Sequence, residues 1–138
     1  YPLATHYAVR SRSPAVVRIS LENGGDPNKC QGSSHNSPLD ECVGEVEHVL
    51  EIAELLFEYK ADPNAMHGQR LTALQSVVAS GSNFSSVRME CAKLLLQHGA
   101  DPNVGRGTKP IYDAVKRGRT GLVKLLLQHG ADPNQAGG

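Results

Sequence analysis

The tripeptide Asp-Pro-Asn occurs four times in this chain of 138 residues, beginning at Asp26, Asp62, Asp101 and Asp132. Successive copies are 36, 39 and 31 residues apart. The last two copies belong to an identical block of ten residues, which covers 94–103 and recurs at 125–134. This spacing, in a chain of ordinary domain length, indicates stacked copies of one small unit that cannot bury its apolar face alone.

Each unit carries helix start and stop signals. Ser37 and Thr72 have hydroxyl groups that can cap exposed backbone amides, and Pro38 follows Ser37 where a proline loses no hydrogen bond. Before the last Asp-Pro-Asn, apolar residues follow a helical period: Leu122, Val123, Leu125, Leu126 and Leu127. Gly130 then ends that helix, and Asp-Pro-Asn favours a chain reversal. We therefore expect helices separated by turns in every unit.

The second unit departs from the others at its helix end. Lys60 stands where the other units have Gly24, Gly99 and Gly130. Glycine adopts the left-handed conformation of a helix end without steric cost, whereas lysine does not. We expect this helix end to be strained or differently shaped.

The repeat resembles the ankyrin-repeat family, whose unit of about 33 residues consists of two antiparallel helices and a turn. Degraded forms of the family signature Thr-Pro-Leu-His stand at residues 3–6, 37–40, 72–75 and 109–112. Small or β-branched pairs replace the family's two core alanines: Ala8-Val9, Cys42-Val43, Val77-Val78 and Ala114-Val115. The resemblance implies an all-α solenoid of stacked helix-turn-helix units, with short β-turn or hairpin fingers.

The resemblance also implies one ankyrin-repeat domain over residues 1–138. Its predicted repeats are 1–28, 29–64, 65–103 and 104–134. The chain begins inside a first helix and stops after a turn, so we expect it to be a fragment of a longer protein. Terminal repeats usually have a polar outer face, but the last repeat keeps the apolar triplet at residues 125–127. We expect exposed apolar surface there.

Composition argues against two classes of function. The chain has 14 basic and 14 acidic residues, and therefore a formal net charge of zero. It lacks a continuous basic stripe with base-stacking aromatic residues, which makes nucleic acid an unfavourable partner. The longest apolar runs are triplets, far short of the ~18 residues of a membrane span, so we expect no membrane insertion.

No residue pattern indicates catalysis or metal binding. His98 and His129 occupy the same slot in adjacent repeats, about 8–10 Å apart by helix packing, so they favour a helix-end role over a shared ion. We interpret the repeated aspartates as turn formers. Cys42 and Cys91 fall at apolar core positions, whereas Cys30 lies in a turn. We predict no enzyme activity, no cofactor, no metal and no small-molecule substrate.

Charge is distributed unevenly along the chain. Residues 37–64 carry a net charge of −7, and residues 104–134 carry +4. Such a dipole can steer and orient a charged partner, although rows of charge on helices are often only solvated faces.

The resemblance implies a partner-binding surface on the concave side, formed by turn tips and by the exposed face of each first helix. Aromatic and arginine side chains carry most binding hot spots. The predicted surface consists of Tyr7, Arg10, Glu41, Glu45, Met66, His67, Arg70, Ser80, Arg106, Lys116 and Arg117. The loop around Phe84 is the alternative binding surface.

We therefore predict a non-catalytic module that binds another protein through a rigid concave surface. The alternative is a structural spacer, or a slice of a longer repeat array in a protein whose activity lies elsewhere. We expect an intracellular location, cytoplasmic or nuclear, because the three cysteines form no metal or redox motif and no secretory signal precedes them.

Overall fold

The computed structural model describes residues 4–30, 36–42, 48–66, 71–79 and 84–135. These residues form seven α-helices and one 3₁₀ turn. In chain order the elements are α1 (Ala4–Arg10), α2 (Pro14–Glu22), η1 (Asp40–Cys42), α3 (Val49–Glu58), α4 (Ala73–Val78), α5 (Ser86–Gln97), α6 (Pro110–Lys116) and α7 (Thr120–Gln128). The mostly helical architecture is the one that the sequence predicts.

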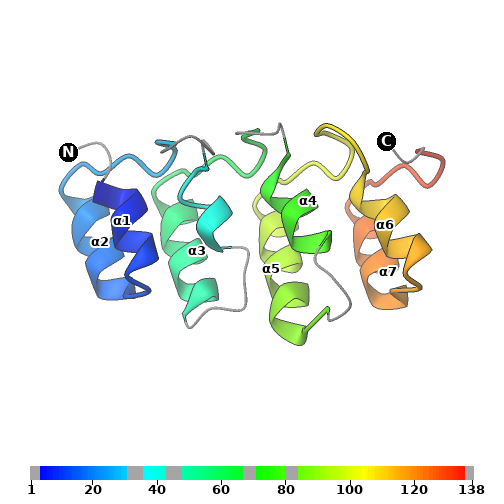
Figure 1. Ribbon diagram of the computed structural model, residues 1–138, viewed down its shortest axis with the longest axis horizontal. Coiled ribbons are helices and arrows are strands. Elements are labelled where there is room, and N and C mark those ends of the chain that lie inside the picture. Colours follow the sequence, from blue (N-terminus) through cyan, green and yellow to red (C-terminus); the bar gives the residue numbers. More distant parts are fainter. Residues whose placement is uncertain (1–3, 31–35, 43–47, 67–70, 80–83, 136–138) are drawn as a thin grey trace.

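The elements form four pairs, stacked along the long axis of the molecule (Figure 1). The first pair is α1 with α2, the second is η1 with α3, the third is α4 with α5, and the fourth is α6 with α7. The first elements make one layer and the second elements make the other, while the turns run along one edge (Figure 1). Helix α3 contacts both α2 and α5, so each pair supports the next.

Hydroxyl caps begin several helices, and the cap at Thr72 is one that the sequence predicts. The Thr72 hydroxyl accepts a hydrogen bond from the backbone amide of Gln75 at 3.2 Å. The side-chain oxygen of Gln75 accepts one from the backbone amide of Thr72 at 3.0 Å. This reciprocal capping box satisfies two amides at the start of α4. Ser85 caps α5 through the Arg88 amide, and Ser13 caps α2 through the Val16 amide. Residues 43–47, which follow η1, lie outside the described residues.

The left-handed residue after each second helix gives the same helix end in all four pairs. Lys60 has a φ of +70°, close to the +92° of Gly99. The amide of Ala61 donates to the carbonyl of Leu56 at 2.9 Å, as the amide of Ala100 does to that of Leu95. The expected difference in shape is therefore absent, and Lys60 adopts a conformation that is unfavourable for a side chain with a Cβ atom.

The aspartate of each Asp-Pro-Asn closes its turn. In every copy, one carboxylate oxygen accepts a hydrogen bond from the amide of the asparagine two residues later, at 2.8 to 2.9 Å. This is the geometry of an Asx turn, and it confirms the interpretation of these aspartates as turn formers.

The asparagines join one pair to the next. The Asn64 side chain donates to the Gly99 carbonyl at 2.9 Å and accepts from the Asp101 amide at 2.6 Å. Asn28 and Asn103 make the same two bonds to the pairs that follow them. We call this arrangement the asparagine clamp. It fixes the spacing of successive turns along the edge of the stack.

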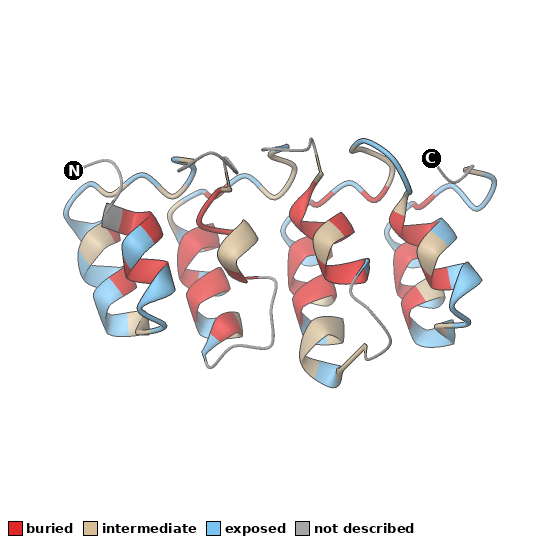
Figure 2. Ribbon diagram, viewed as in Figure 1, coloured by how far each residue is buried: buried red, intermediate tan, exposed pale blue. Residues whose placement is uncertain are grey.

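The core lies between the layers and between successive pairs (Figure 2). Leu56, Leu74, Leu122 and Leu126 are among its fully buried side chains. The ring of Phe57 stacks on that of His98 in the next pair, with centroids 4.2 Å apart. His98 is thus a helix-end residue that packs against a neighbour, which supports a structural interpretation.

Candidate protein-interaction surface

The first-element layer presents polar side chains outward because small residues occupy its inward positions. In α1, Ala8 and Val9 are buried, while Tyr7 and Arg10 beside them are exposed. In α6, Ala114 is buried, whereas Val115 and Lys116 are exposed, as is Arg117 directly after the helix. We define the first-helix surface by the described members of the predicted site: Tyr7, Arg10, Glu41, Met66, Arg106, Lys116 and Arg117.

A hollow of about 170 Å³ lies on this surface between the first and second pairs. Its charged lining is Arg10, Arg12 and Glu41, and its floor includes Cys42 and Ile52. Arg12 has a φ of +60°, the left-handed conformation that Gly118 adopts after α6. The chain therefore turns sharply after α1, and this turn places Arg12 in the lining of the same hollow as Arg10.

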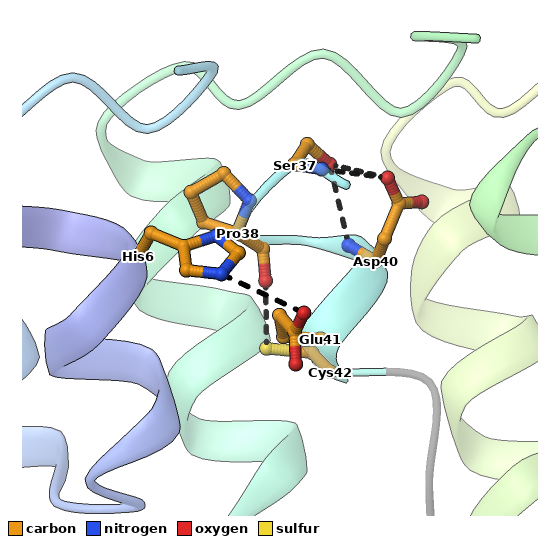
Figure 3. Close-up of polar contacts among 6 residues, drawn as sticks. All are labelled: His6, Ser37, Pro38, Asp40, Glu41 and Cys42. Atoms are coloured by element: carbon orange, nitrogen blue, oxygen red, sulfur yellow. Dashed lines mark hydrogen bonds and ion pairs between the residues drawn. The ribbon is translucent and has the colours of Figure 1, made fainter. Parts of the chain in front are cut away.

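Hydrogen bonds between Ser37 and Asp40 fix the start of η1, the element that carries Glu41 (Figure 3). The carboxylate of Asp40 accepts from the Ser37 amide at 2.8 Å and from its hydroxyl at 3.0 Å, and the hydroxyl accepts from the Asp40 amide. Glu41 follows directly, and its Oε1 lies 3.6 Å from Nε2 of the buried His6 in α1 (Figure 3). The first and second pairs therefore meet through a polar contact between Glu41 of the first-helix surface and the buried His6.

The turn tip before α6 is fixed from both sides. The side-chain amide of Gln75 donates to the carbonyl of Arg106 at 2.9 Å and to that of Thr108 at 3.0 Å. The ammonium group of Lys109 donates to the carbonyl of Gly105, which has a φ of +105°. A Cβ atom on Gly105 would lie 1.8 Å from Oε1 of Gln75. The exposed side chain of Arg106 therefore projects from a backbone that is held in one conformation.

Basic groups dominate the fourth pair. The ammonium nitrogen of Lys116 lies 6.0 Å from the ring centroid of Tyr112, and Nε of Arg117 lies 4.0 Å from Oδ1 of Asp113. Exposed contacts of this length contribute little to stability. Both basic side chains are exposed, so a partner could bind them while breaking only contacts that add little to the stability of the chain.

The structure places only part of the predicted site. Tyr7, Arg10, Met66, Arg106, Lys116 and Arg117 are exposed, and Glu41 is half-buried. Four further predicted residues, Glu45, His67, Arg70 and Ser80, lie outside the described residues.

Sequence reasoning missed two contributors to this surface. Gln75 organises the tip that carries Arg106, and Arg12 lines the hollow beside Arg10. The signal for Gln75 was its place at the histidine position of the signature, three residues after the capping residue Thr72. No pattern in the sequence pointed to Arg12, because its place depends on a left-handed turn at a residue other than glycine.

The alternative surface around Phe84 has a structural role. The guanidinium carbon of Arg119 lies 4.5 Å from the ring centroid of Phe84, and Nη1 of Arg119 donates to the Val78 carbonyl at 2.8 Å. Burial, followed by the charge of Arg117, lowers the pKa of Arg119 from its ordinary value. Phe84 and Arg119 line a shallow hollow of about 280 Å³ between α5 and α7. These contacts join the third and fourth pairs.

The thiols are poor nucleophiles. Burial raises the pKa of Cys42 and Cys91, and burial together with Asp40 raises that of Cys30. A raised pKa disfavours the reactive thiolate at neutral pH. Cys42 and Cys91 are buried, as the sequence predicts, and Cys30 is partly exposed. Within the residues that the structure describes, no group of three histidine, cysteine or acidic side chains could hold a metal ion.

The family model for ankyrin repeats in three copies matches residues 42–136. This match covers more than half of the chain. The stacked helical pairs of the observed fold agree with the helix-turn-helix units of that family. The chain therefore belongs to the ankyrin-repeat family. No curated protein matches the chain significantly.

Ankyrin repeats are generally non-enzymatic modules for protein interaction. Among the described residues, no helix has the length and apolar character needed to cross a membrane.

Proposed function

We propose that this chain is a non-catalytic module whose first-helix surface binds another protein. The observation that carries the proposal is the group of exposed aromatic and basic side chains on one layer of a stacked scaffold. Tyr7 and Arg10 stand at one end of the layer, and Lys116 and Arg117 stand at the other. Arginine and tyrosine are enriched among residues that dominate binding energy.

The scaffold lowers the entropic cost of such binding. The backbone of the tip at Arg106 is held by Gln75 and Lys109, and the turns are held by the asparagine clamp. Groups that are already ordered before association lose less conformational freedom when a partner arrives. Affinity can therefore come from a few long side chains on this surface.

Charge provides the specificity in this proposal. The fourth pair carries the exposed groups of Arg106, Lys116 and Arg117, whereas residues 37–64 of the second pair have a net charge of −7. A partner with an acidic segment facing the fourth pair and a basic segment facing the second pair would be oriented during encounter. High salt should weaken this association because it screens exposed charges.

The three free cysteines support an intracellular location, cytoplasmic or nuclear, where thiols remain reduced.

The second candidate function is a structural segment within a longer array of repeats. The stacking of four similar pairs favours it, because each pair packs on the next as in a longer solenoid.

Affinity capture from cell lysate tests the proposed surface. The bait is the chain itself, compared with a Lys116→Glu, Arg117→Glu double variant, and retained proteins are identified by mass spectrometry. The matched control is Arg18→Glu, Lys124→Glu, which changes the net charge equally at exposed positions of α2 and α7. Circular dichroism verifies that all three proteins are folded.

We expect a specific protein to bind the parent chain and the control but not the double variant on α6. Its recovery should also fall as salt rises. Equal recovery by all three baits would contradict binding through the basic end of the first-helix surface.

A further inference from the structure

The connection between α1 and α2 combines basic and hydroxyl side chains in one short segment. Residues 10–14 read Arg-Ser-Arg-Ser-Pro. Ser13 therefore has an arginine one residue and another three residues before it, and a proline directly after it. Protein kinases recognise their substrates by the charges around the hydroxyl group, and one large class also requires a proline after it. The segment thus has the sequence features of a phosphorylation site.

The structure distinguishes Ser13 from the other Ser-Pro dipeptide of the chain, Ser37-Pro38. Ser37 is 4% exposed, and its hydroxyl donates to the Asp40 carboxylate at 3.0 Å. Ser13 is partly exposed, and its hydroxyl accepts a long hydrogen bond of 3.4 Å from the Val16 amide. A kinase must reach the hydroxyl oxygen that it modifies. Accessibility therefore favours Ser13 over Ser37.

Two further hydroxyl groups lie beside arginines, but their local structure differs from that of Ser13. Residues 117–120 read Arg-Gly-Arg-Thr, yet Thr120 is the first residue of α7 and glycine follows it. Ser11 donates its hydroxyl to the Ala8 carbonyl. Ser13 has an extended backbone, with φ of −108° and ψ of 112°. Kinases bind extended substrate segments, so the backbone conformation also favours Ser13.

The exposure of Ser13 belongs to its edge of the stack. The connection between α1 and α2 lies at the edge opposite the Asp-Pro-Asn turns (Figure 1). Its counterpart in the third pair is Ser85, which caps α5. The third pair has neighbours on both sides, and Ser85 is nevertheless partly exposed. A neighbouring pair therefore leaves this edge accessible.

A phosphate on Ser13 would change the charge beside the hollow between the first and second pairs. The charged lining of this hollow is Arg10, Arg12 and Glu41. A phosphoserine carries about −1.5 to −2 charges at neutral pH, so the net charge of these groups would change from +1 to about −1. Arginine and phosphate form strong hydrogen bonds because both groups are ionised.

We propose that Ser13 is a phosphorylation site and that its phosphate pairs with Arg10 and Arg12. A serine kinase transfers the terminal phosphoryl group of ATP to Oγ of Ser13. An O–P bond forms, the bond between that phosphorus atom and the leaving ADP breaks, and the hydroxyl proton passes to the catalytic base of the kinase. The phosphate then withdraws the charge of Arg10 from the first-helix surface. Only its effect on partner binding rests on the proposed function.

Mass spectrometry after kinase treatment tests the first half of the proposal. The folded chain is incubated with magnesium ATP and, in separate reactions, with an arginine-directed and a proline-directed serine kinase. Peptide mapping then locates each phosphate. An Arg10→Ala, Arg12→Ala double variant removes the basic groups, and Pro14→Ala removes the proline. Circular dichroism verifies that both variants are folded.

We expect phosphate at Ser13 and none at Ser37. The loss of the two arginines should slow the arginine-directed kinase by about tenfold, the effect of losing one charge-assisted contact with the kinase. Pro14→Ala should slow the proline-directed kinase by a similar factor. The absence of phosphate at Ser13 in both reactions would overturn the proposal. Phosphate on Ser11 or Thr120 in its place would do the same.

Phosphorus NMR tests the second half, the pairing with arginine. Phosphoserine is incorporated at position 13 during translation, so that the arginine variants can carry it without a kinase. The pKa of the phosphate is measured in the parent chain and in the Arg10→Ala, Arg12→Ala variant. Lys116→Ala, Arg117→Ala is the matched control, because it removes the same charge from the distant fourth pair.

We expect the phosphate of the parent chain to have a pKa about one unit below its ordinary value of about 6, since nearby positive charge favours the dianion. The variant without Arg10 and Arg12 should return the pKa of the phosphate towards 6, and the control should leave it low. Equal pKa values in all three proteins would overturn the pairing. Neither experiment needs a binding partner, so failure here is distinct from failure of the first-helix surface to bind a protein.

Discussion

The aspartate and the asparagine of the repeated turn have different structural roles in this stack. The aspartate closes its own turn, whereas the asparagine two residues later bonds to the backbone of the following pair. The first role is local and can be predicted from sequence, because aspartate commonly caps an amide two residues ahead. The second role joins residues that are distant in the chain, so no local pattern reveals it.

The clamp gives a prediction with an internal control. Asn64→Ala should lower the free energy of unfolding by about 1–2 kcal/mol, since two hydrogen bonds between pairs are lost. Asn134→Ala removes the same side chain where no described pair follows, and it should change stability by less than about 0.5 kcal/mol. Urea unfolding of dilute protein measures both. Equal losses for the two variants would contradict a role for the clamp between pairs.

Lys60 offers a second test at the residue scale. Lys60→Gly should stabilise the protein by about 0.5–1 kcal/mol, because glycine relieves the strain of the left-handed conformation. The greater freedom of glycine in the unfolded chain offsets part of this gain. Gly99→Ala at the equivalent position should destabilise by about 1 kcal/mol, since a Cβ atom there meets no neighbour and only the backbone conformation costs energy. Thermal unfolding midpoints should shift in opposite directions. A lower midpoint for Lys60→Gly would show that the lysine side chain stabilises this helix end.

At the scale of elements, the second helices were easier to predict than the first. The apolar period in α7 and the glycine after it define a helix and its end, and the structure has both. The first elements are short, with only six or seven residues in α1, α4 and α6, so their extent could not be deduced from capping residues alone. The tip before α6 depends on the distant side chain of Gln75, which local sequence does not reveal.

The tip provides a prediction that separates a steric contact from backbone strain. Gly105→Ala should destabilise more than Gly107→Ala, because only the first new Cβ atom would collide with Gln75. Both glycines have positive φ values, +105° and +76°, so both variants carry the cost of a left-handed alanine. We expect a difference of about 1–3 kcal/mol between them, the cost of overpacking a contact. Equal unfolding free energies would argue against a fixed tip.

For the whole molecule, the repeat spacing was enough to predict a helical stack, and the family match agrees with it. Which side chains reach the surface was predicted less completely. Tyr7, Lys116 and Arg117 are exposed as expected, although the pair before Lys116 has only Ala114 buried. The hollow at Arg12 depends on how the first and second pairs stack, which local sequence patterns do not reveal.

Backbone hydrogen exchange of the chain with a captured partner tests most directly whether the first-helix surface binds proteins. The exchange rates of amides in α1, η1, α6 and the tip before α6 are compared with those in α2, α3, α5 and α7, before and after the partner is added. We predict that the partner slows exchange in the first group and leaves the second group nearly unchanged. Protection confined to α2, α3, α5 and α7 would contradict binding through the first-helix surface.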